Sequence, residues 1–178
     1  MARPAPKSAL LAPSKLRHGA STRVAIEDRA LGHEFATAPG FKLVAPDGTV
    51  AIRHGPLNPG PLHALRSTLV DSFRSGSYTA KTLMKPKDLY RAFSDEEFRL
   101  GAYWTDVRPA GPLQSTIDSA LLPSFENAAT KVVHIRVPAN ETVFEGFAAE
   151  QSAEPGIHLI GGGRQIVVLN VDPSWEVE

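Results

Sequence analysis

The chain has 178 residues, no cysteine, and 19 lysine and arginine side chains against 19 aspartate and glutamate side chains. This length suffices for one domain with a sizeable core plus a loose extension, and it is too short for two ordinary domains. The balanced charge provides no bulk attraction to nucleic acid or to a membrane surface. The lack of cysteine excludes disulfides, thiolate zinc sites and cysteine nucleophiles.

The N-terminal region shows no targeting signal and no membrane segment. Residues 1–30 are rich in alanine, proline, serine and arginine without sustained periodicity, which predicts a flexible leader without chemistry. The apolar run Ala9–Ala12 stops at Pro13 and is too short for a secretory signal peptide. No segment approaches the roughly 20 apolar residues that span a bilayer. We therefore expect a soluble chain that needs a dedicated export machine if it is secreted.

The segment FKLVAPDGTVAIRHG, residues 41–55, has two short alternating runs around a Pro-Asp-Gly turn. This pattern predicts a β-hairpin. We group the hairpin with the leader as an accessory region of residues 1–55. Residues 56–178, which begin within the hinge GPLNPGP, then form the catalytic domain.

The remainder of the chain predicts a small α+β domain. Apolar residues at helical spacing, Leu62, Leu65, Leu69 and Phe73, predict an amphipathic helix that ends before Gly76. A second helix is predicted at residues 113–121, and strands are predicted around Arg91 and at residues 102–105, 131–137, 141–147 and 165–170. We expect a curved, mainly antiparallel sheet with one or two helices packed on it.

Arg91 lies inside the apolar run LYRAF, residues 89–93. By the two-residue period of a strand it shares a face with Leu89 and Phe93, where an unpaired guanidinium is costly. Its planar fork suits a bidentate contact with a pyrophosphate on the floor of a cleft. The alternative is an edge-strand arginine that pairs with Asp95 or Glu96.

Tyr103, Trp104 and Thr105 form a short strand-like run in GAYWT. Side chains alternate across a strand, so one ring is expected to face the core and the other the opposite face. An aromatic ring beside an arginine suits stacking on nicotinamide or adenine. The alternative for Trp104 is an ordinary core tryptophan.

The segment GGGRQ, residues 161–165, places three glycines before a strand-like run. Glycine allows positive φ and a close approach of the main chain to a ligand, which makes Gly163 a candidate ligand contact. The segment lacks the spaced glycines of the dinucleotide fingerprint, and no helix is expected after it. Its main interest is that it delivers Gln165 to the first position of a strand. There the amide can hold a ribose hydroxyl or position a water.

Three further polar side chains belong to the candidate set: Gln114, Glu150 and Gln151. Gln114 and Asp118 lie four residues apart and therefore on one face of a helical turn. They either support the site or cap and solubilise the helix. Glu150, next to Gln151, is the carboxylate to suspect if a transfer reaction needs an acceptor base.

Taken in order, LYRAF, GAYWT, DSALLP and GGGRQ resemble segments of the C-terminal toxin domains of bacterial polymorphic toxins, the Rhs-type and contact-dependent inhibition proteins. More specifically, these segments resemble the NAD-consuming group around the tuberculosis necrotizing toxin, whose fold is related to ADP-ribosyltransferases. The resemblance covers roughly residues 77–175. The chain departs from that group by the insertion SAEPGIHLI before the glycines and by the tryptophan of GAYWT, which replaces a smaller aliphatic residue.

The resemblance implies a role for each matching residue. Arg91 would hold the NAD phosphates, Tyr103, Trp104 and Thr105 would line the nicotinamide end, and Gln165 would be the catalytic glutamine. The implied activity is that of an NAD(P)+ glycohydrolase toxin, with NAD or NADP as substrate. Such a toxin is secreted or delivered into the cytoplasm of a target cell, and a cognate immunity protein is its expected partner.

Two other functions remain open from the sequence. An ADP-ribosyltransferase would modify a protein or nucleic acid, with Glu150 or Glu145 as the carboxylate near the anomeric carbon. The lack of an acid beside Gln165 favours hydrolysis. A noncatalytic binding module would use Arg91 and Trp104 for packing only.

Metal-dependent nuclease chemistry is disfavoured. His134 and His158 have no partner at metal-ligand spacing, so both are expected to be structural and no metal site is predicted. The choice between NAD and NADP depends on one more basic contact to a 2′-phosphate. Arg99, Arg108 and Arg164 are the candidates for that contact.

Overall fold

The computed structural model describes residues 41–44, 49–152 and 155–177, and of residues 41–44 only the backbone. All of these residues belong to one compact unit. The predicted leader and the Pro-Asp-Gly turn of the hairpin lie outside the described residues.

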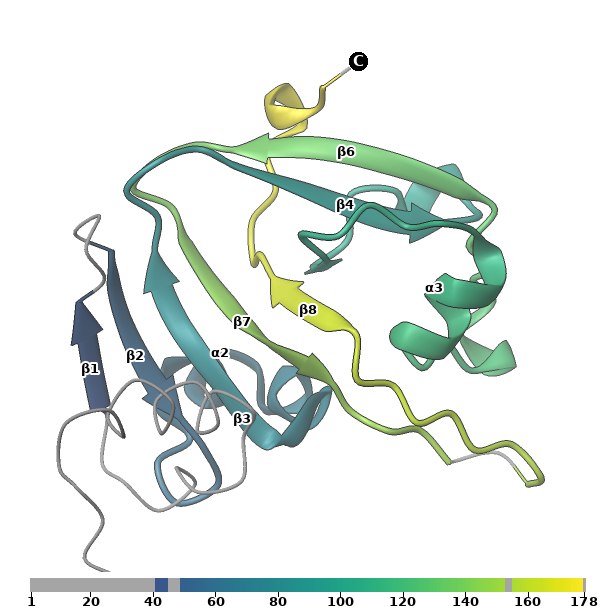
Figure 1. The fold of residues 1–178 in the computed structure, drawn as a ribbon, viewed down its shortest axis with the longest axis horizontal. Helices are drawn as coiled ribbons and strands as arrows, with labels where there is room; N and C mark the ends of the chain where they lie inside the picture. The colour runs from purple at the N-terminus through teal and green to yellow at the C-terminus, as the bar shows by residue number, and fades with distance from the viewer. Residues whose placement is uncertain (1–40, 45–48, 153–154, 178) are drawn as a thin grey trace, which may run out of the picture. The chain divides into compact units, whose positions relative to one another are not determined.

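The fold is α+β, with a mostly antiparallel sheet that does not close on itself (Figure 1). Six strands follow the order β1-β2-β3-β7-β8-β5, and two more, β4 and β6, form a second sheet. The strands are β1 Phe41–Val44, β2 Val50–His54, β3 Phe73–Thr82, β4 Lys87–Phe93, β5 Tyr103–Trp104, β6 Lys131–Val137, β7 Thr142–Ala148 and β8 Arg164–Val167. The helices are α2 Gly60–Asp71 and α3 Pro112–Asp118, with single 3-10 turns at Glu96–Phe98, Pro123–Phe125 and Pro173–Trp175.

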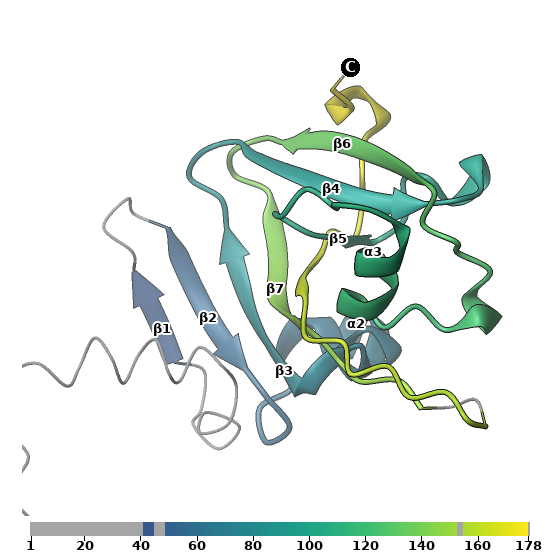
Figure 2. The same cartoon turned by 45° about the vertical axis from the view of Figure 1, so that its right-hand side comes forward.

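One bridge joins the two sheets. Tyr90 on β4 donates its backbone N–H to the carbonyl oxygen of Thr105 at 2.8 Å, and the Thr105 N–H returns a bond to the Tyr90 carbonyl at 2.9 Å. Strand β5 therefore lies between β8 and β4. Figure 2 shows β4 and β6 crossing above β5. The mainly antiparallel sheet predicted from the sequence is therefore present as two sheets that are joined at this bridge.

The sheet buries apolar side chains on both of its faces. One cluster lies between the two sheets and includes Leu89, Trp104, Ile135 and Ile166. The other cluster lies under α2 and is formed by Leu62, Leu69, Val70, Phe73, Tyr78, Phe144 and Val167. Because Ile166 and Val167 are neighbours in β8, the clusters occupy opposite faces of that strand.

The predicted helix at residues 62–73 needs one correction. Helix α2 ends at Asp71, and Phe73 is the first residue of β3 instead of the last helical residue. The ladder between β3 and β7 changes register between Phe73 and Tyr78. Gly76, with φ of 59°, lies in this irregular stretch. The glycine therefore permits a β-bulge and does not mark a helix end.

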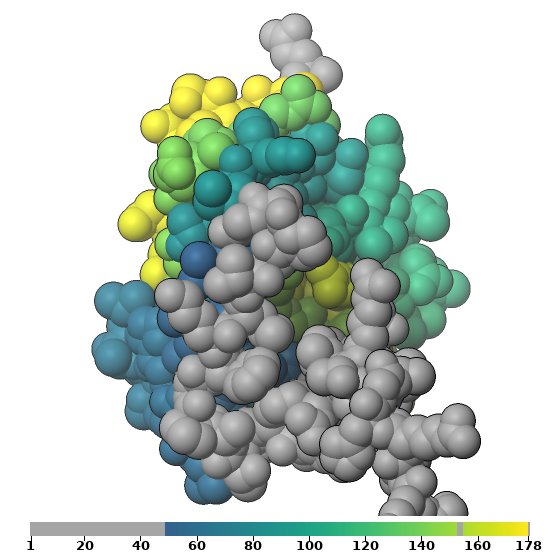
Figure 3. Space-filling view, turned by 60° about the vertical axis from the view of Figure 1, so that its left-hand side comes forward, coloured from purple at the N-terminus to yellow at the C-terminus, as the bar shows by residue number. Residues whose placement is uncertain are grey.

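The other predicted elements lie close to those in the structure. The hairpin strands pair antiparallel, and β2 also pairs with β3 over five residues, Val50 to His54, so the hairpin extends the main sheet. The second helix stops at Asp118, and β8 covers only Arg164–Val167. In Figure 3 the green segment between β5 and β6, which holds α3, forms one side of the face shown. No helix of the described residues is long and apolar enough to cross a membrane.

Candidate functional site

Strand register gathers three of the predicted residues on one face of the sheet. Tyr103 pairs with Val167 and Trp104 with Ile166. Continuing this register by one residue places Thr105 opposite Gln165. The next row is confirmed by an ion pair between Asp106 and Arg164, with Nη2 and Oδ2 2.8 Å apart. We call the side that carries Tyr103, Thr105, Gln165 and Val167 the Gln165 face.

The amide of Gln165 has a fixed orientation. The side chain is 8% exposed, and Nε2 donates to the carbonyl oxygen of Ser72 at 3.0 Å and to Ser72 Oγ at 2.9 Å. Because the Ser72 hydroxyl donates its own proton to the Leu69 carbonyl at 2.7 Å, Oγ acts as an acceptor for Gln165. The amide nitrogen is therefore turned toward Ser72, and Oε1 points the other way.

The amide oxygen of Gln165 is free to accept a hydrogen bond. Among the described residues no donor contacts Oε1, and this atom is not among the buried polar atoms that lack a partner. It therefore keeps contact with solvent. The structure places Gln165 second in β8, after Arg164, one position later than the sequence predicts.

The glycine loop delivers Gln165 by packing tightly against the protein. Gly162 donates its N–H to the Ala148 carbonyl and Gly163 donates its N–H to the Asp118 carbonyl, each at 2.9 Å. A Cβ added to Gly163 would lie 2.6 Å from Asp118 Cβ. Because both N–H groups are used within the protein, the loop has few donors left for a phosphate. Close packing against the end of β7 requires glycine at position 161, and close packing against α3 requires it at position 163.

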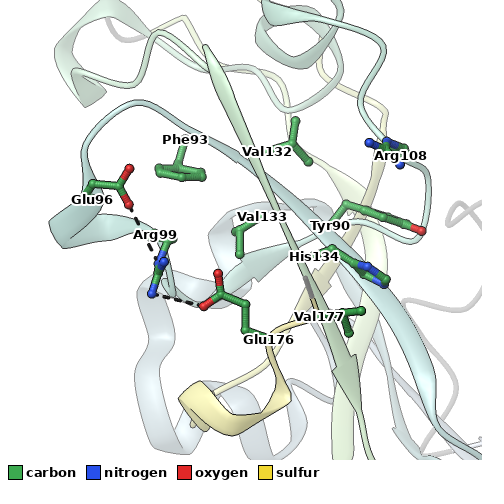
Figure 4. Close-up of a pocket in the computed structure, with 10 residues that line it drawn as sticks. All are labelled: Tyr90, Phe93, Glu96, Arg99, Arg108, Val132, Val133, His134, Glu176 and Val177. Carbon is green, nitrogen blue, oxygen red and sulfur yellow. Dashed lines mark ion pairs between the residues drawn. The ribbon is translucent and has the colours of Figure 1, made fainter.

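A shallow hollow lies beside the Gln165 face, where β4 and β6 carry Tyr90 and His134 (Figure 4). It has a volume of 330 Å³, and its lining includes Arg108 and the half-exposed Val132. The rings of Tyr90 and His134 stack with centroids 4.7 Å apart. Because Tyr90 bridges to Thr105, the row from Gln165 through Thr105 continues to Tyr90.

The end of the hollow away from Tyr90 and His134 is lined by charged side chains (Figure 4). There Arg99 pairs with Glu176 at 3.1 Å and lies 4.0 Å from Glu96. Arg108, in contrast, has no ion pair with any described residue and is exposed. It is therefore the lining cation whose charge is available to a ligand.

Arg91 does not share the Gln165 face. It lies on the same side of β4 as Leu89 and Phe93, which belong to the core between the sheets together with Trp104. Its Nε donates to the Phe98 carbonyl at 3.2 Å and its Nη1 to the Tyr103 carbonyl at 2.9 Å. The single cleft expected for Arg91 and Gln165 is therefore not formed. Strand alternation sends the two side chains to opposite faces.

The guanidinium of Arg91 also lacks an acidic partner. Among the described residues no carboxylate forms an ion pair with it, and burial lowers the pKa of Arg91. Of the two acids that the alternative names, Asp95 accepts from the Glu97 N–H and Glu96 pairs with Lys131 at 2.7 Å. Arg91 therefore holds the loop between β4 and β5 through main-chain carbonyls.

The two rings of GAYWT occupy different environments, as alternation predicts. Trp104 is 3% exposed in the core between the sheets, and its Nε1 donates to the Gly101 carbonyl at 2.7 Å. Tyr103 is 38% exposed. Trp104 thus packs as a core tryptophan, and Tyr103 is the ring of this pair that a ligand can reach.

An ion cluster ties the two sheets together on the face opposite Gln165. Lys87 on β4 contacts Glu145 on β7 at 2.6 Å and Asp106 at 3.2 Å. Lys81 contacts Glu145 at 3.2 Å, and Arg164 lies 3.8 Å from it. We call these five residues the inter-sheet ion cluster. Glu145, one of the acids considered for ADP-ribosyl transfer, is therefore fully engaged by cations.

Burial and charge oppose each other in this cluster. Burial alone would raise the pKa of Asp106, but Arg164 and Lys87 outweigh it and hold the pKa at about 2. Burial would likewise raise the pKa of Glu145, and Lys87 and Lys81 reverse this and lower it. Both carboxylates are therefore ionised at neutral pH.

None of the remaining candidates forms a hydrogen bond or ion pair with Gln165 among the described residues. Gln114 Nε2 donates to Asp118 Oδ1 at 2.7 Å on the surface of α3, which is an i,i+4 contact within the helix and caps neither of its ends. The Glu150 side chain is 73% exposed and lies 4.0 Å from His158. Gln151 pairs through its main chain with Leu159. The described contacts connect neither Glu150 nor Gln151 to the Gln165 face.

Two residues of this region escape sequence reasoning. Ser72 contacts Gln165 across 93 residues of chain, and nothing in its local sequence signals that contact. Asp106 directly follows GAYWT. If the strand continued by one residue, Asp106 would lie on the side opposite Thr105, and this is where the structure places its ion pair with Arg164. No family model, curated protein or solved structure matches this chain.

Proposed function

We propose that this protein hydrolyses the nicotinamide-ribosyl bond of NAD(P)+ on the Gln165 face. The observation that carries the proposal is the row formed by Gln165, Thr105 and Tyr90 on adjacent strands. Adjacent strands lie about 4.8 Å apart, so this row extends over roughly 10 Å. It offers an amide oxygen at one end and an aromatic ring at the other.

Gln165, Tyr103 and Arg108 each have a role in the proposal. Gln165 Oε1 accepts a hydrogen bond from the attacking water and orients it toward the anomeric carbon. The exposed ring of Tyr103 shields the nicotinamide. Arg108, the lining cation of the hollow without an ion pair among the described residues, provides the charge for the phosphates in place of Arg91.

The proposed reaction needs no strong acid. Nicotinamide leaves as a neutral molecule from a cationic ring, so the C–N bond breaks with its electron pair going to nitrogen. Water forms the new C–O bond, and its proton is released to solvent, giving ADP-ribose from NAD+ and ADP-ribose 2′-phosphate from NADP+. An oxocarbenium-like transition state of this kind depends mainly on positioning and on oriented dipoles.

The test is nicotinamide release by the purified protein from NAD+ and NADP+ without an added acceptor. The proposal expects steady turnover of at least one of the two. Label transfer from NAD+ into proteins or nucleic acid of a lysate, without acceptor-free turnover, would favour ADP-ribosyl transfer. The absence of both nicotinamide release and label transfer would contradict any NAD-consuming function and favour a noncatalytic module.

The toxin assignment is part of the same proposal and is supported by the sequence resemblance alone. It expects that expression of the chain lowers the NAD content of a bacterial cell. It also expects that a cognate immunity protein prevents this loss by covering the exposed part of the Gln165 face, where Tyr103 lies. A catalytically inactive Gln165→Ala chain that remained equally harmful to the cell would contradict this part of the proposal.

A further inference from the structure

We infer that Ser72 is a positioning residue that orients the Gln165 amide for the proposed hydrolysis, an inference that rests on the proposed function. Ser72 is the C-cap residue of α2 and precedes the segment that resembles the toxin domains. Its two oxygens are the acceptors of both Gln165 Nε2 hydrogen bonds.

The two possible orientations of the Gln165 amide differ in the hydrogen bonds that they form with Ser72. With Nε2 toward Ser72, the amide satisfies two acceptors, and Oε1 is left for substrate or water. In the flipped orientation Oε1 would face the Ser72 carbonyl, and two acceptors would oppose each other. The Ser72 hydroxyl cannot relieve this by donating, because its proton already goes to the Leu69 carbonyl at 2.7 Å.

Ser72 is itself held in place from two sides. Its carbonyl oxygen also accepts the Ala149 N–H at 2.8 Å, just after β7. Gly146, the residue paired with Gln165, is covered by Phe73. A Cβ at position 146 would lie 2.6 Å from Phe73 Cδ1. The end of α2 and the adjoining strand therefore set the direction of the Gln165 side chain.

The hydroxyl of Ser72 supplies one of the two directing bonds. Without it, the amide keeps a single bond to the Ser72 carbonyl and has more freedom to rotate. A loss of orientation of this kind slows the chemical step more than it weakens substrate binding. The expected signature is therefore a lower kcat at an unchanged KM.

The experiment compares NAD+ turnover by wild type, Ser72→Ala, Ser72→Thr and Gln165→Ala, with folding of each checked by circular dichroism. Ser94→Ala is the control, because Ser94 Oγ also donates to a main-chain carbonyl, that of Glu126. We expect Ser72→Ala to lower kcat roughly tenfold at unchanged KM. Ser72→Thr, which keeps an oxygen, should retain most of kcat, and Ser94→Ala should match wild type.

A double variant separates positioning from stability. Ser72→Ala added to Gln165→Ala should cost no further activity, because Ser72 acts through Gln165. Full activity of Ser72→Ala alongside an inactive Gln165→Ala would overturn the inference and leave the proposed function intact. A slower double variant, or no recovery in Ser72→Thr, would assign Ser72 a structural role only. No turnover by wild type would overturn the proposed function and this inference together.

Discussion

At the scale of single residues, close packing explains the glycine run better than ligand binding does. Gly163 lies against Asp118, and an added Cβ would meet both Asp118 Cβ and its carbonyl oxygen. We expect Gly163→Ala to lower the free energy of unfolding by roughly 1–3 kcal/mol, measured by urea denaturation. Gly111→Ala is the matched control, because nothing lies within 4 Å of its Cβ. Equal losses in both variants would contradict this account.

We expect a substitution of Arg91 to lower stability and a substitution of Arg108 to weaken the binding of NAD+. Arg91→Lys loses the fork that reaches the carbonyls of Phe98 and Tyr103, so it should lower stability by about 1–2 kcal/mol. Arg108→Ala should raise the KM for NAD+ and leave stability unchanged. Urea denaturation and initial rates measure the two effects. A raised KM in Arg91→Lys at wild-type stability would return the phosphate role to Arg91.

Gln165→Glu tests whether the site requires an amide or an acid. A carboxylate at position 165 has no donor for the Ser72 carbonyl, which the glutamine contacts at 3.0 Å. We expect the variant to lose turnover by roughly 100-fold, close to the loss in Gln165→Ala. Initial rates of nicotinamide release measure it. Turnover at or above the wild-type rate would show that the site functions with an acid.

At the scale of elements, the inter-sheet ion cluster makes the junction of β4 with β7 depend on pH. The pKa of Asp106 in the folded chain, about 2, lies below its ordinary value of 3.8, so ionisation favours folding. The stability it provides, on the order of 2 kcal/mol, is fully present above its unfolded pKa and is lost as pH falls toward 2. Glu145, whose pKa is also lowered, contributes with the same sign.

Lys87→Met tests this junction. Lys87 contacts both acids, so its loss should lower stability at pH 7 by about 2 kcal/mol, less than for a fully buried pair. The difference in the free energy of unfolding between Lys87→Met and wild type should become smaller at low pH, because Asp106 and Glu145 then become neutral. Urea denaturation at several pH values measures it. Lys85→Met is the control, because Lys85 is exposed. A difference in the free energy of unfolding between Lys87→Met and wild type that stayed constant down to pH 3 would contradict this explanation.

Element patterns in the sequence predict most strands but not their partners. Alternation in KVVHIRV predicts β6 with its correct ends, Lys131–Val137. The apolar spacing predicts a helix over residues 62–73 that is too long, because Phe73 continues that spacing although the chain leaves the helix after Asp71 and enters a bulged strand. Periodicity describes one element at a time, and the bulge depends on pairing with β7.

At the scale of the whole molecule, the candidate site depends on contacts between distant segments. The sequence points to Arg91 and Gln165 as chemically interesting residues, but their faces follow from the order β7-β8-β5 and the bridge to β4. Their separation could not be predicted without that topology. The same holds for Ser72, which reaches Gln165 only because α2 packs under the sheet.

The most direct measurement of the central claim is kcat for nicotinamide release by Gln165→Ala against Gln151→Ala, at saturating NAD+ and without an acceptor. Both variants lose a glutamine amide, but only Gln165 lies opposite Thr105 on the Gln165 face, whereas Gln151 pairs with Leu159. We predict a loss of roughly 100-fold for Gln165→Ala and wild-type turnover for Gln151→Ala. Equal turnover in the two variants would contradict the assignment of the site.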